Sequence, residues 1–322
     1  DYISFMFSSF FFGLFVRKVN VVIGTSPQFF TVISAWALSK LKRVPFVFEL
    51  RDIWPASITA VGAMKRNWII NTLEKLELFL YRQADLIISV THSFKSELRH
   101  RGVPADKIKV VLNGVDSSEY KPLAEKDNEF SRKYQLEGKF VAGYIGTHGL
   151  AHALDTIIEA ANLIKAEDNI RIILVGGGAE RLRLEQQVKI YALSNVVMIP
   201  RQPKANMQRI WSLCDVSLVT LKDKPLFSNV IPSKIFESMA MALPTLIAVP
   251  EGESTEIIKT ENSGLVLPPE DPYSLVEALL NIKKNKELYN ELAFNSLLAA
   301  SKFNRKTLAI EMLNHIEELF RP

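Results

Sequence analysis

Short apolar runs rich in β-branched residues alternate along this chain with segments whose apolar residues recur at helical spacing. A strand inside a parallel sheet is apolar almost throughout, whereas a helix that covers the sheet is apolar on one face. Over residues 19–112 the pattern predicts strands joined by helices. The predicted strands are Val19–Gly24, Pro45–Leu50, Asp85–Val90 and Ile108–Leu112. The predicted helices are Pro27–Lys42, Asn67–Gln83 and Ser93–Arg101.

The alternation stops at a polar stretch, Ser117–Asn128, which is the best linker candidate in the chain, and then it resumes. The strands predicted beyond this linker are Phe140–Ile145, Ile170–Val175, Val196–Ile199, Val216–Thr220, Thr245–Ala248 and Gly264–Leu267. The helices predicted there are Leu154–Ala166, Glu180–Ala192, Asn206–Leu213, Ser233–Met241, Ser254–Thr260, Pro272–Lys283, Lys286–Ser301 and Arg305–Leu319.

Two runs of strand–helix–strand units predict an α/β protein with two doubly wound, Rossmann-like domains. We assign residues 1–118 to the first domain, residues 119–304 to the second, and residues 305–322 to a closing helix. Ligands of doubly wound sheets bind beyond the carboxyl ends of the strands. With two such domains, we expect the site in the cleft between them.

Composition narrows the class of protein. The chain has 322 residues, of which 48% are hydrophobic and 23% charged, and this balance is typical of a globular protein. A single cysteine, Cys214, excludes a disulfide framework and a cysteine-based zinc site. No His, Asp and Glu set has metal-ligand spacing, so no metal is expected.

Charge is unevenly spread, because Lys and Arg outnumber Asp and Glu over residues 1–118 but not over the rest. The basic excess suits an anionic partner such as a lipid phosphate or a membrane surface, but on charge alone random variation is the favoured explanation. No basic stripe is interleaved with aromatic residues, so nucleic-acid binding is not expected.

The segment Tyr2–Val16 is apolar, uncharged and rich in Phe. A membrane-spanning helix needs about 20 apolar residues, and a signal peptide needs a basic leader and a cleavage site. Two alternatives remain, a buried helix or a helix that lies on a membrane interface. The chain enters this segment directly from Asp1, which suggests a fragment whose N-terminus lies upstream.

Candidate chemistry gathers at the predicted strand ends of the second domain. Gly146-Thr147-His148-Gly149 and Gly176-Gly177-Gly178 both lie between a strand and a helix. Small residues let the backbone approach a phosphate, and a helix N-terminus attracts anions. Each sequence alone also fits an ordinary tight turn.

Two further turns carry charge. Lys234 and Glu237 share a face at the start of the helix that follows Ser233. A cation there is unfavourable unless it meets an anion, and Glu237 could accept hydrogen bonds from two vicinal hydroxyls; a surface ion pair is the alternative. Glu256 lies in a similar turn after Gly252, which also fits an N-cap.

In the first domain, Arg51-Asp52 follows the strand Pro45–Leu50, and Trp54 comes just after it. Charge and an aromatic residue at a strand end suit recognition of a sugar or phosphate. A structural Arg–Asp pair is the alternative.

Taken in order, these pieces resemble the family 4 retaining glycosyltransferases of the GT-B fold over nearly the whole chain. The motifs that carry the resemblance are Asn113-Gly114-Val115-Asp116, Gly143-Tyr144-Ile145-Gly146, Val175-Gly176-Gly177-Gly178, Pro232 to Ala240 and Gly252 to Gly264. The stretches Glu49–Pro55 and Ile231–Glu237 are most similar to the WbuB-like group, which transfers amino sugars in O-antigen, capsule or exopolysaccharide synthesis.

The resemblance implies a GT-B protein with two domains facing a cleft, the first incomplete because such enzymes begin with more of the acceptor domain. It also implies that the closing helix, residues 305–322, crosses back to the first domain. It implies transfer of an N-acetylated amino or deoxy sugar, with retention, from a UDP-sugar to a glycan on undecaprenyl diphosphate. No cofactor or metal is expected. The protein would be cytoplasmic and peripheral, at the inner face of the plasma membrane.

The resemblance also implies residue roles. Glu237 would hold the ribose, Lys234 and Arg201 would meet the diphosphate, and Arg51 and Asp52 would position the acceptor. These implied catalytic residues are Asp52, Arg51, Lys234 and Glu237. The implied donor-binding residues are Gly146, Thr147, His148, Gly149, Gly176, Gly177, Arg201, Asn229, Ser233, Lys234, Glu237 and Glu256.

Two features depart from the family pattern. Asn229 replaces the first of two characteristic glutamates, and the places of a phosphate-binding Arg and Lys fall near Thr147 and His152. Two alternatives to a transferase therefore stay open. One is a GT-B UDP-sugar 2-epimerase, and the other is a non-catalytic subunit that binds a nucleotide-sugar.

Overall fold

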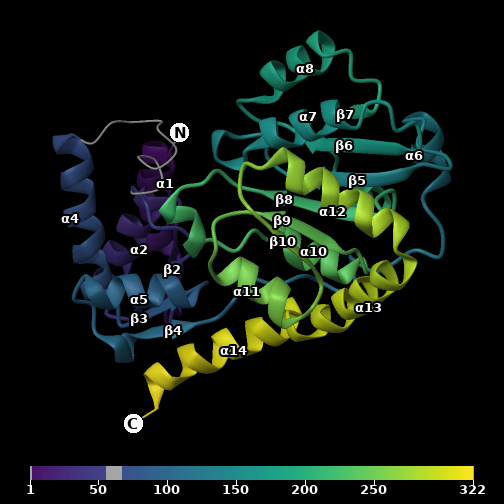
Figure 1. Cartoon of the computed structure of the whole chain (residues 1–322). Helices are drawn as coiled ribbons and strands as arrows, with labels where there is room; N and C mark the ends of the chain where they lie inside the picture. The colour runs from purple at the N-terminus through teal and green to yellow at the C-terminus, as the bar shows by residue number, and fades with distance from the viewer. Residues whose placement is uncertain (1, 56–66, 322) are drawn as a thin grey trace. The chain divides into compact units, whose positions relative to one another are not determined.

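The computed structural model describes residues 2–55 and 67–321, and these residues form two compact units (Figure 1). The first unit comprises Asp1–Leu112 with Lys306–Pro322, and the second comprises Asn113–Arg305. The boundary therefore falls ahead of the one expected at residue 118. The reason is a pair of backbone hydrogen bonds, because Val115 donates to Phe303 and accepts from Arg305, and these bonds hold residues 113–116 in the second unit.

The first unit is built on a four-stranded parallel sheet in the order β1-β2-β3-β4. The strands are β1 (Val22–Thr25), β2 (Phe46–Leu50), β3 (Leu86–Ser89) and β4 (Ile108–Val110). All four lie within the predicted apolar runs, except that β1 extends one residue past its predicted end. Parallel strands need helical crossovers, and the helices of this unit are α1 (Tyr2–Phe15), α2 (Phe29–Lys42), α4 (Trp68–Gln83), α5 (His92–His100) and α14 (Arg305–Glu317).

Helices on both faces bury this sheet. On one face, Phe46, Phe48 and Ile87 pack in a cluster with Phe29 of α2 and Leu80 of α4. Side-chain caps start two of the helices, since Asn67 accepts from the Ile70 N–H and Thr91 from the Phe94 N–H.

The closing helix α14 covers the other face of the first sheet. Ile316 is 8% exposed and packs with Val47, Leu86 and Ile88. An ion pair between Lys109 and Glu318 (3.5 Å) supports the same contact. The last helix thus belongs to the unit that contains the start of the chain.

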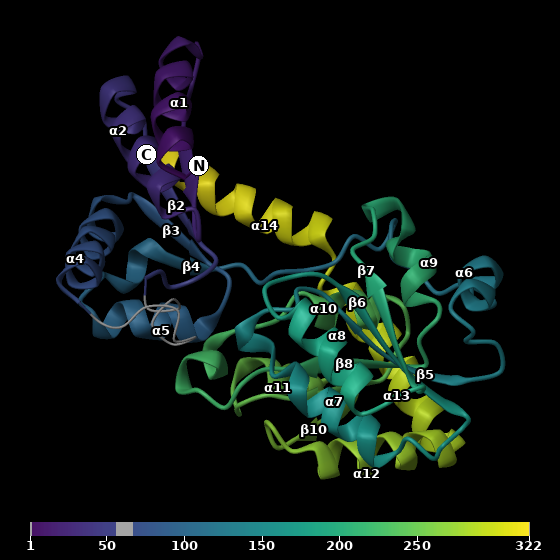
Figure 2. The same ribbon diagram turned by 90° about the horizontal axis from the view of Figure 1, so that it is seen from above.

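The N-terminal helix α1 has no buried residue. It lies beside α2 in both views (Figures 1 and 2), and the Ser9 and Ser34 hydroxyls are 2.9 Å apart. The exposed fractions of Phe7 and Phe12 are 65% and 69%. In the described part of the chain, the buried alternative for this segment is therefore wrong. Among the described residues, no helix is long and apolar enough to cross a membrane.

The second unit contains a six-stranded parallel sheet in the order β10-β9-β8-β5-β6-β7. The strands are β5 (Phe140–Ile145), β6 (Ile170–Gly176), β7 (Val196–Pro200), β8 (Val216–Thr220), β9 (Thr245–Ala248) and β10 (Gly264–Leu267). The chain adds β6 and β7 on one side of β5 and then returns to place β8 on the other. The sheet therefore has a topological switch point between β5 and β8, where doubly wound proteins bind ligands.

The helices of the second unit are α6 (Asn128–Lys133), α7 (Leu154–Leu163), α8 (Arg181–Ile190), α9 (Met207–Trp211), α10 (Lys234–Ala240), α11 (Glu253–Thr260), α12 (Pro272–Lys284) and α13 (Lys286–Lys302). Ile157 of α7 and Leu279 of α12 pack together against Leu174 and Leu218 of the sheet. Helix α6 begins inside the predicted linker. Asp127 caps it and also binds Arg209 of α9 at 2.6 Å, and these contacts fix a stretch that is polar in sequence.

We predict that Ile316→Ala lowers the stability of the first unit by about 2–4 kcal/mol, because it opens a cavity between α14 and the sheet. Urea unfolding of the whole chain, followed by the fluorescence of its Trp residues, measures the change. The matched control is Ile310→Ala in the same helix, where the side chain is 52% exposed. Equal midpoints for the two variants would contradict the packing described here.

Candidate functional site

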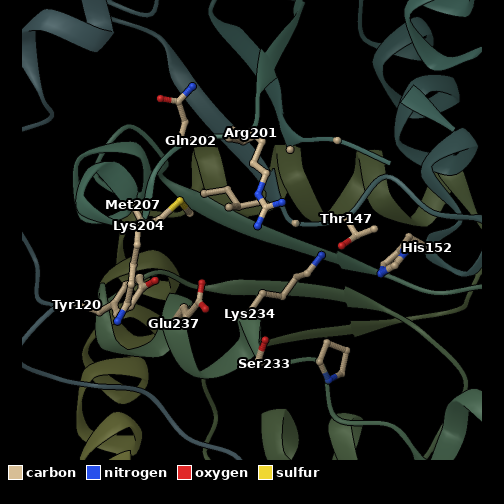
Figure 3. Close-up of a pocket in the computed structure, with 16 residues that line it drawn as sticks. Tyr120, Thr147, His152, Arg201, Gln202, Lys204, Met207, Ser233, Lys234 and Glu237 are labelled. Atoms are coloured by element: carbon tan, nitrogen blue, oxygen red, sulfur yellow. The ribbon is translucent and has the colours of Figure 1, made fainter. Parts of the chain in front are cut away.

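The second unit has a cavity of about 570 Å³ at the carboxyl ends of β5, β6 and β7, beside the switch point (Figure 3). The loops after these strands and the first turn of α10 line it. The lining residues are Tyr120, Ile145, Gly146, Thr147, His152, Val175, Gly176, Gly177, Arg201, Gln202, Lys204, Met207, Pro232, Ser233, Lys234 and Glu237. All of them belong to the second unit.

Two glycines let the loops close around the cavity. Gly146 has a φ of 151°, and a Cβ there would lie 2.9 Å from Lys234 Nζ. Gly176 has a φ of 145°, and its Cβ would fall on the carbonyl oxygen of Gly146. Residues other than glycine rarely adopt these backbone angles. Glycine therefore keeps both strand ends close to each other and to the Lys234 ammonium.

Lys234 is the central charge of the cavity (Figure 3). Its Nζ atom is buried and has no hydrogen-bond partner among the described residues. It lies 3.4 Å from the ring centroid of Tyr144, which is a cation–π contact. Burial lowers the pKa of Lys234 to about 7, against the opposing effect of Glu237. An ammonium in this setting gains most from an anion, because no acceptor within residues 2–55 and 67–321 satisfies its hydrogens.

Glu237 is the acidic group among the described residues that line the cavity. Its Oε2 accepts a hydrogen bond of 3.1 Å from Nε1 of Trp211, a fully buried side chain. Burial raises the pKa of Glu237, while the Trp211 hydrogen bond and the Lys234 charge lower it. Tyr120 lies beside Glu237 (Figure 3), and burial together with the Glu237 charge raises the pKa of Tyr120 to about 12. Because Trp211 occupies one carboxylate oxygen, the other is available to a ligand hydroxyl.

Two histidines follow β5. His152 lines the cavity, whereas His148 is fully buried under the loop and neither of its ring nitrogens has a partner among the described residues. Burial, with the positive charges nearby, lowers the pKa of each to about 4. Both rings are therefore neutral at pH 7 in the free protein.

The cavity brings together eight of the sequence-predicted residues: Gly146, Thr147, Gly176, Gly177, Arg201, Ser233, Lys234 and Glu237. Four predicted donor-binding residues are not among its described lining: His148, Gly149, Asn229 and Glu256. Glu256 pairs instead with Lys259 at 3.2 Å on the exposed side of α11, and His148 is fully buried. Asn229 ends a short 3-10 helix, Pro225–Asn229.

Sequence reasoning missed part of the lining. Tyr120 comes from the polar stretch after the first unit, and an ion pair of 2.7 Å between Lys204 and Glu119 ties this stretch to the β7 side. Gln202 comes from the loop after β7, and Met207 is the first residue of the helix α9 that follows this loop. Ligand sites tend to lie at strand ends, and this tendency indicates the region after β7. The residue types there do not show which of its side chains line the cavity.

Arg51 and Asp52 lie in the first unit, at the carboxyl end of β2. The Ser26 hydroxyl holds this turn, because it accepts from the N–H groups of Arg51 (2.9 Å) and Asp52 (3.2 Å) and donates to the Asp52 carbonyl oxygen. Trp54 stacks on Phe29 with ring centroids 4.9 Å apart. The turn is thus fixed within its own unit.

No group of three or more His, Cys, Asp or Glu side chains that could hold a metal ion occurs in residues 2–55 and 67–321.

The fold is that of GT-B glycosyltransferases, as comparison with solved structures shows. Sucrose-phosphate synthase of Thermosynechococcus elongatus aligns over 98% of this chain and 77% of its own, with a TM-score of 0.81 and 19% identity. HepE of Anabaena, solved in complex with UDP, aligns over 98% and 82%, with a TM-score of 0.78 and 17% identity. The expected fold class is therefore confirmed.

The chain belongs to the family described as glycosyl transferases group 1, whose model matches residues 126–296, more than half of the sequence. The model described as glycosyltransferase family 4 matches residues 7–119.

Two curated relatives have names from polysaccharide synthesis. The probable glycosyltransferase WbjE of Pseudomonas aeruginosa is 27% identical over 73% of this chain and 58% of its own length. The putative colanic acid biosynthesis glycosyl transferase WcaI of Escherichia coli is 25% identical over 74% and 60%. The chain thus spans about three fifths of the length of these relatives.

We predict that Gly176→Ala destabilises the second unit by about 1–3 kcal/mol, because the new methyl group collides with the Gly146 carbonyl at a strained φ. Thermal unfolding measures the loss. Gly177→Ala is the matched control, since a Cβ at Gly177 meets nothing within 4 Å. If Gly176→Ala unfolded at the same temperature as Gly177→Ala, the close approach of the two loops would be refuted.

Proposed function

We propose that the second unit binds a nucleoside diphosphate sugar and that the protein transfers the sugar to a glycan acceptor in polysaccharide synthesis. One observation carries the proposal: the buried Lys234 ammonium has no partner among the described residues and lies at the glycine loops of the cavity. A diphosphate supplies the acceptor oxygens that this ammonium lacks. Glu237, one helical turn further on, is placed to accept hydrogen bonds from vicinal hydroxyls such as those of a ribose.

The comparisons support this choice of ligand. HepE was solved with UDP and with UDP-glucose, and its fold matches this chain closely. The names of WbjE and WcaI support a role in cell-surface polysaccharide synthesis. The resemblance to the WbuB-like group supports an N-acetylated amino or deoxy sugar on UDP.

The proposed reaction breaks the bond between the anomeric carbon and the donor diphosphate and forms a bond from that carbon to an acceptor hydroxyl oxygen. The acceptor proton passes to a donor phosphate oxygen, and the configuration is retained. Negative charge grows on the departing diphosphate, and Lys234, Arg201 and the Gly146 and Gly176 loops stabilise it. These groups supply positive charge without a metal, so we propose a metal-independent transfer. Arg51 and Asp52 are our candidates for positioning the acceptor.

We predict that Lys234→Ala weakens UDP-sugar binding on the order of 10- to 100-fold, because a charge-assisted hydrogen bond to phosphate is lost. Thermal unfolding against UDP-, GDP-, ADP- and dTDP-sugars measures binding. For the wild-type protein, a ligand present at 100 times its Kd raises the free energy of unfolding by about 2.7 kcal/mol.

The control for this experiment is Lys259→Ala. Lys259 is an exposed lysine of α11 that pairs with Glu251 and Glu256 away from the cavity. Wild-type protein whose unfolding no nucleotide-sugar shifts would overturn the proposal. Turnover then separates the remaining alternatives: a 2-epimerase converts the donor sugar without an acceptor, and a binding subunit converts nothing.

We further propose that the acceptor is a glycan on undecaprenyl diphosphate and that α1 rests on the cytoplasmic face of the membrane that holds it. Helix α1 presents Phe7 and Phe12 to solvent, and Arg17 and Lys18 follow it directly. Lys42 donates to the carbonyl oxygens of Leu14 (3.1 Å) and Val16 (2.8 Å), which adds charge at the same end. An apolar helix face next to basic residues fits the interface of an anionic bilayer.

We predict that replacing Phe7 and Phe12 together by Ser weakens binding to phosphatidylglycerol vesicles at least about tenfold, because the two rings that the proposed contact buries in the bilayer are lost. Co-sedimentation measures the bound fraction. Phe294→Ser serves as the control, since Phe294 is 63% exposed but lies on α13 of the second unit. Equal sedimentation of wild type and the double variant would exclude α1 as the contact.

A further inference from the structure

Two nitrogen side chains flank one aromatic ring at the cavity. Tyr144 in β5 receives the Lys234 ammonium over its face at 3.4 Å. The His152 ring meets the same tyrosine edge-on, with centroids 6.2 Å apart and planes at 78°. His152 and Lys234 point into the same part of the cavity, with Thr147 between them (Figure 3). A ligand anion held by Lys234 therefore lies next to the imidazole.

The hydrogen-bond geometry decides which imidazole nitrogen is available. Nδ1 of His152 lies 3.3 Å from the carbonyl oxygen of Gly149. A carbonyl oxygen only accepts, so this contact suits the tautomer with its hydrogen on Nδ1. Nε2 of that tautomer carries a lone pair and repels phosphate oxygens. It becomes a donor once a proton is added.

We propose that His152 is a second anion-binding side chain of this cavity and that it holds the ligand diphosphate as imidazolium, with one proton taken up from solvent on binding. The inference rests on the proposed function, because it requires a diphosphate next to Lys234. It assigns a binding role to a residue that sequence analysis left out of the donor site.

The charges around His152 set the direction of the effect. The groups that face it are Lys234 from α10, His148 from the preceding turn and Tyr144 from β5. In the free protein, burial and the Lys234 charge lower the pKa of His152 to about 4. A bound diphosphate reverses the local charge and raises this pKa. The added affinity is complete below the pKa of free His152 and disappears as the pH rises through the pKa of the complex.

The test measures UDP-glucose binding to the whole chain by calorimetry at pH 5.0–6.5, in buffers of different ionisation enthalpy. UDP-glucose suits the test because its diphosphate has no proton to lose in this range. Lys234 is mostly charged there, since its own pKa of about 7 lies above this range. We expect wild type to take up protons on binding, with a Kd that rises by up to tenfold per pH unit.

Two variants isolate His152. His152→Gln is neutral at every pH, so at pH 5.0–5.5, where Lys234 is almost fully charged, proton uptake and the pH slope should disappear and the Kd should rise. His152→Lys is charged throughout, so the slope should disappear while tight binding remains, a rescue that a purely structural role would not give. His100→Gln is the matched control, because His100 is exposed on α5 of the first unit.

The outcomes separate the two proposals. If wild type binds UDP-glucose and His152→Gln keeps the wild-type proton uptake and slope, His152 has no such role and the proposed function stands. Wild type that binds no UDP-glucose at any pH would refute UDP-sugar binding itself, and the role of His152 falls with it.

Discussion

The site depends on one electrostatic constraint, the burial of the Lys234 ammonium without a hydrogen-bond acceptor in the part of the chain that the structure describes. A buried charge is unfavourable unless something compensates it. In the free protein, the face of the Tyr144 ring compensates part of it, and the lowered pKa shows that the compensation is incomplete. An anion in the cavity removes the remaining penalty. The same energy that destabilises the empty site is therefore available for binding a diphosphate.

The topology of the second sheet makes this arrangement possible. Strands β5 and β6 are neighbours, and the reversal of strand order opens space between the loop after β5 and the start of α10. Gly146 lets the Lys234 ammonium pass beside that loop, and Gly176 lets the loop after β6 close on it. A side chain at Gly176 would collide with the Gly146 carbonyl oxygen, and one at Gly146 would meet the Lys234 ammonium. Backbone amides and one ammonium can thus meet the same ligand oxygens.

Much of the fold follows from the sequence, because strands buried on both faces leave an unambiguous apolar signal. The predictions for β5, β8, β9 and β10 match the structure at both ends. The sequence did not predict helix α6. The ion pair that holds it joins Asp127 to Arg209, and these two residues lie far apart in the sequence. The exposure of α1 could not be predicted from the sequence either, because an apolar segment has the same residue pattern whether it packs on protein or faces solvent.

The sequence predicted those residues of the candidate site that lie close together along the chain. It did not predict those that only the three-dimensional packing brings to the site. Lys234 and Glu237 are one helical turn apart, and the glycines lie at strand ends, so spacing alone brought them together. Glu256 has the same local features, but its helix turns it toward Lys259 and away from the cavity. Trp211 orients Glu237 from another helix, and no pattern in the sequence links the two.

Every described lining residue of the cavity comes from the second unit, and this has a consequence for function. Binding a nucleotide-sugar requires only the charge, glycine loops and carboxylate found there. The proposed transfer also needs an acceptor hydroxyl, and our candidate for positioning it is the turn of Arg51 and Asp52 in the first unit, which the Ser26 hydroxyl holds. Donor binding and turnover are therefore separable properties. A substitution at that turn that abolished transfer but left donor binding intact would assign the acceptor role to the first unit. A substitution of Lys234, in contrast, should weaken donor binding and therefore transfer as well.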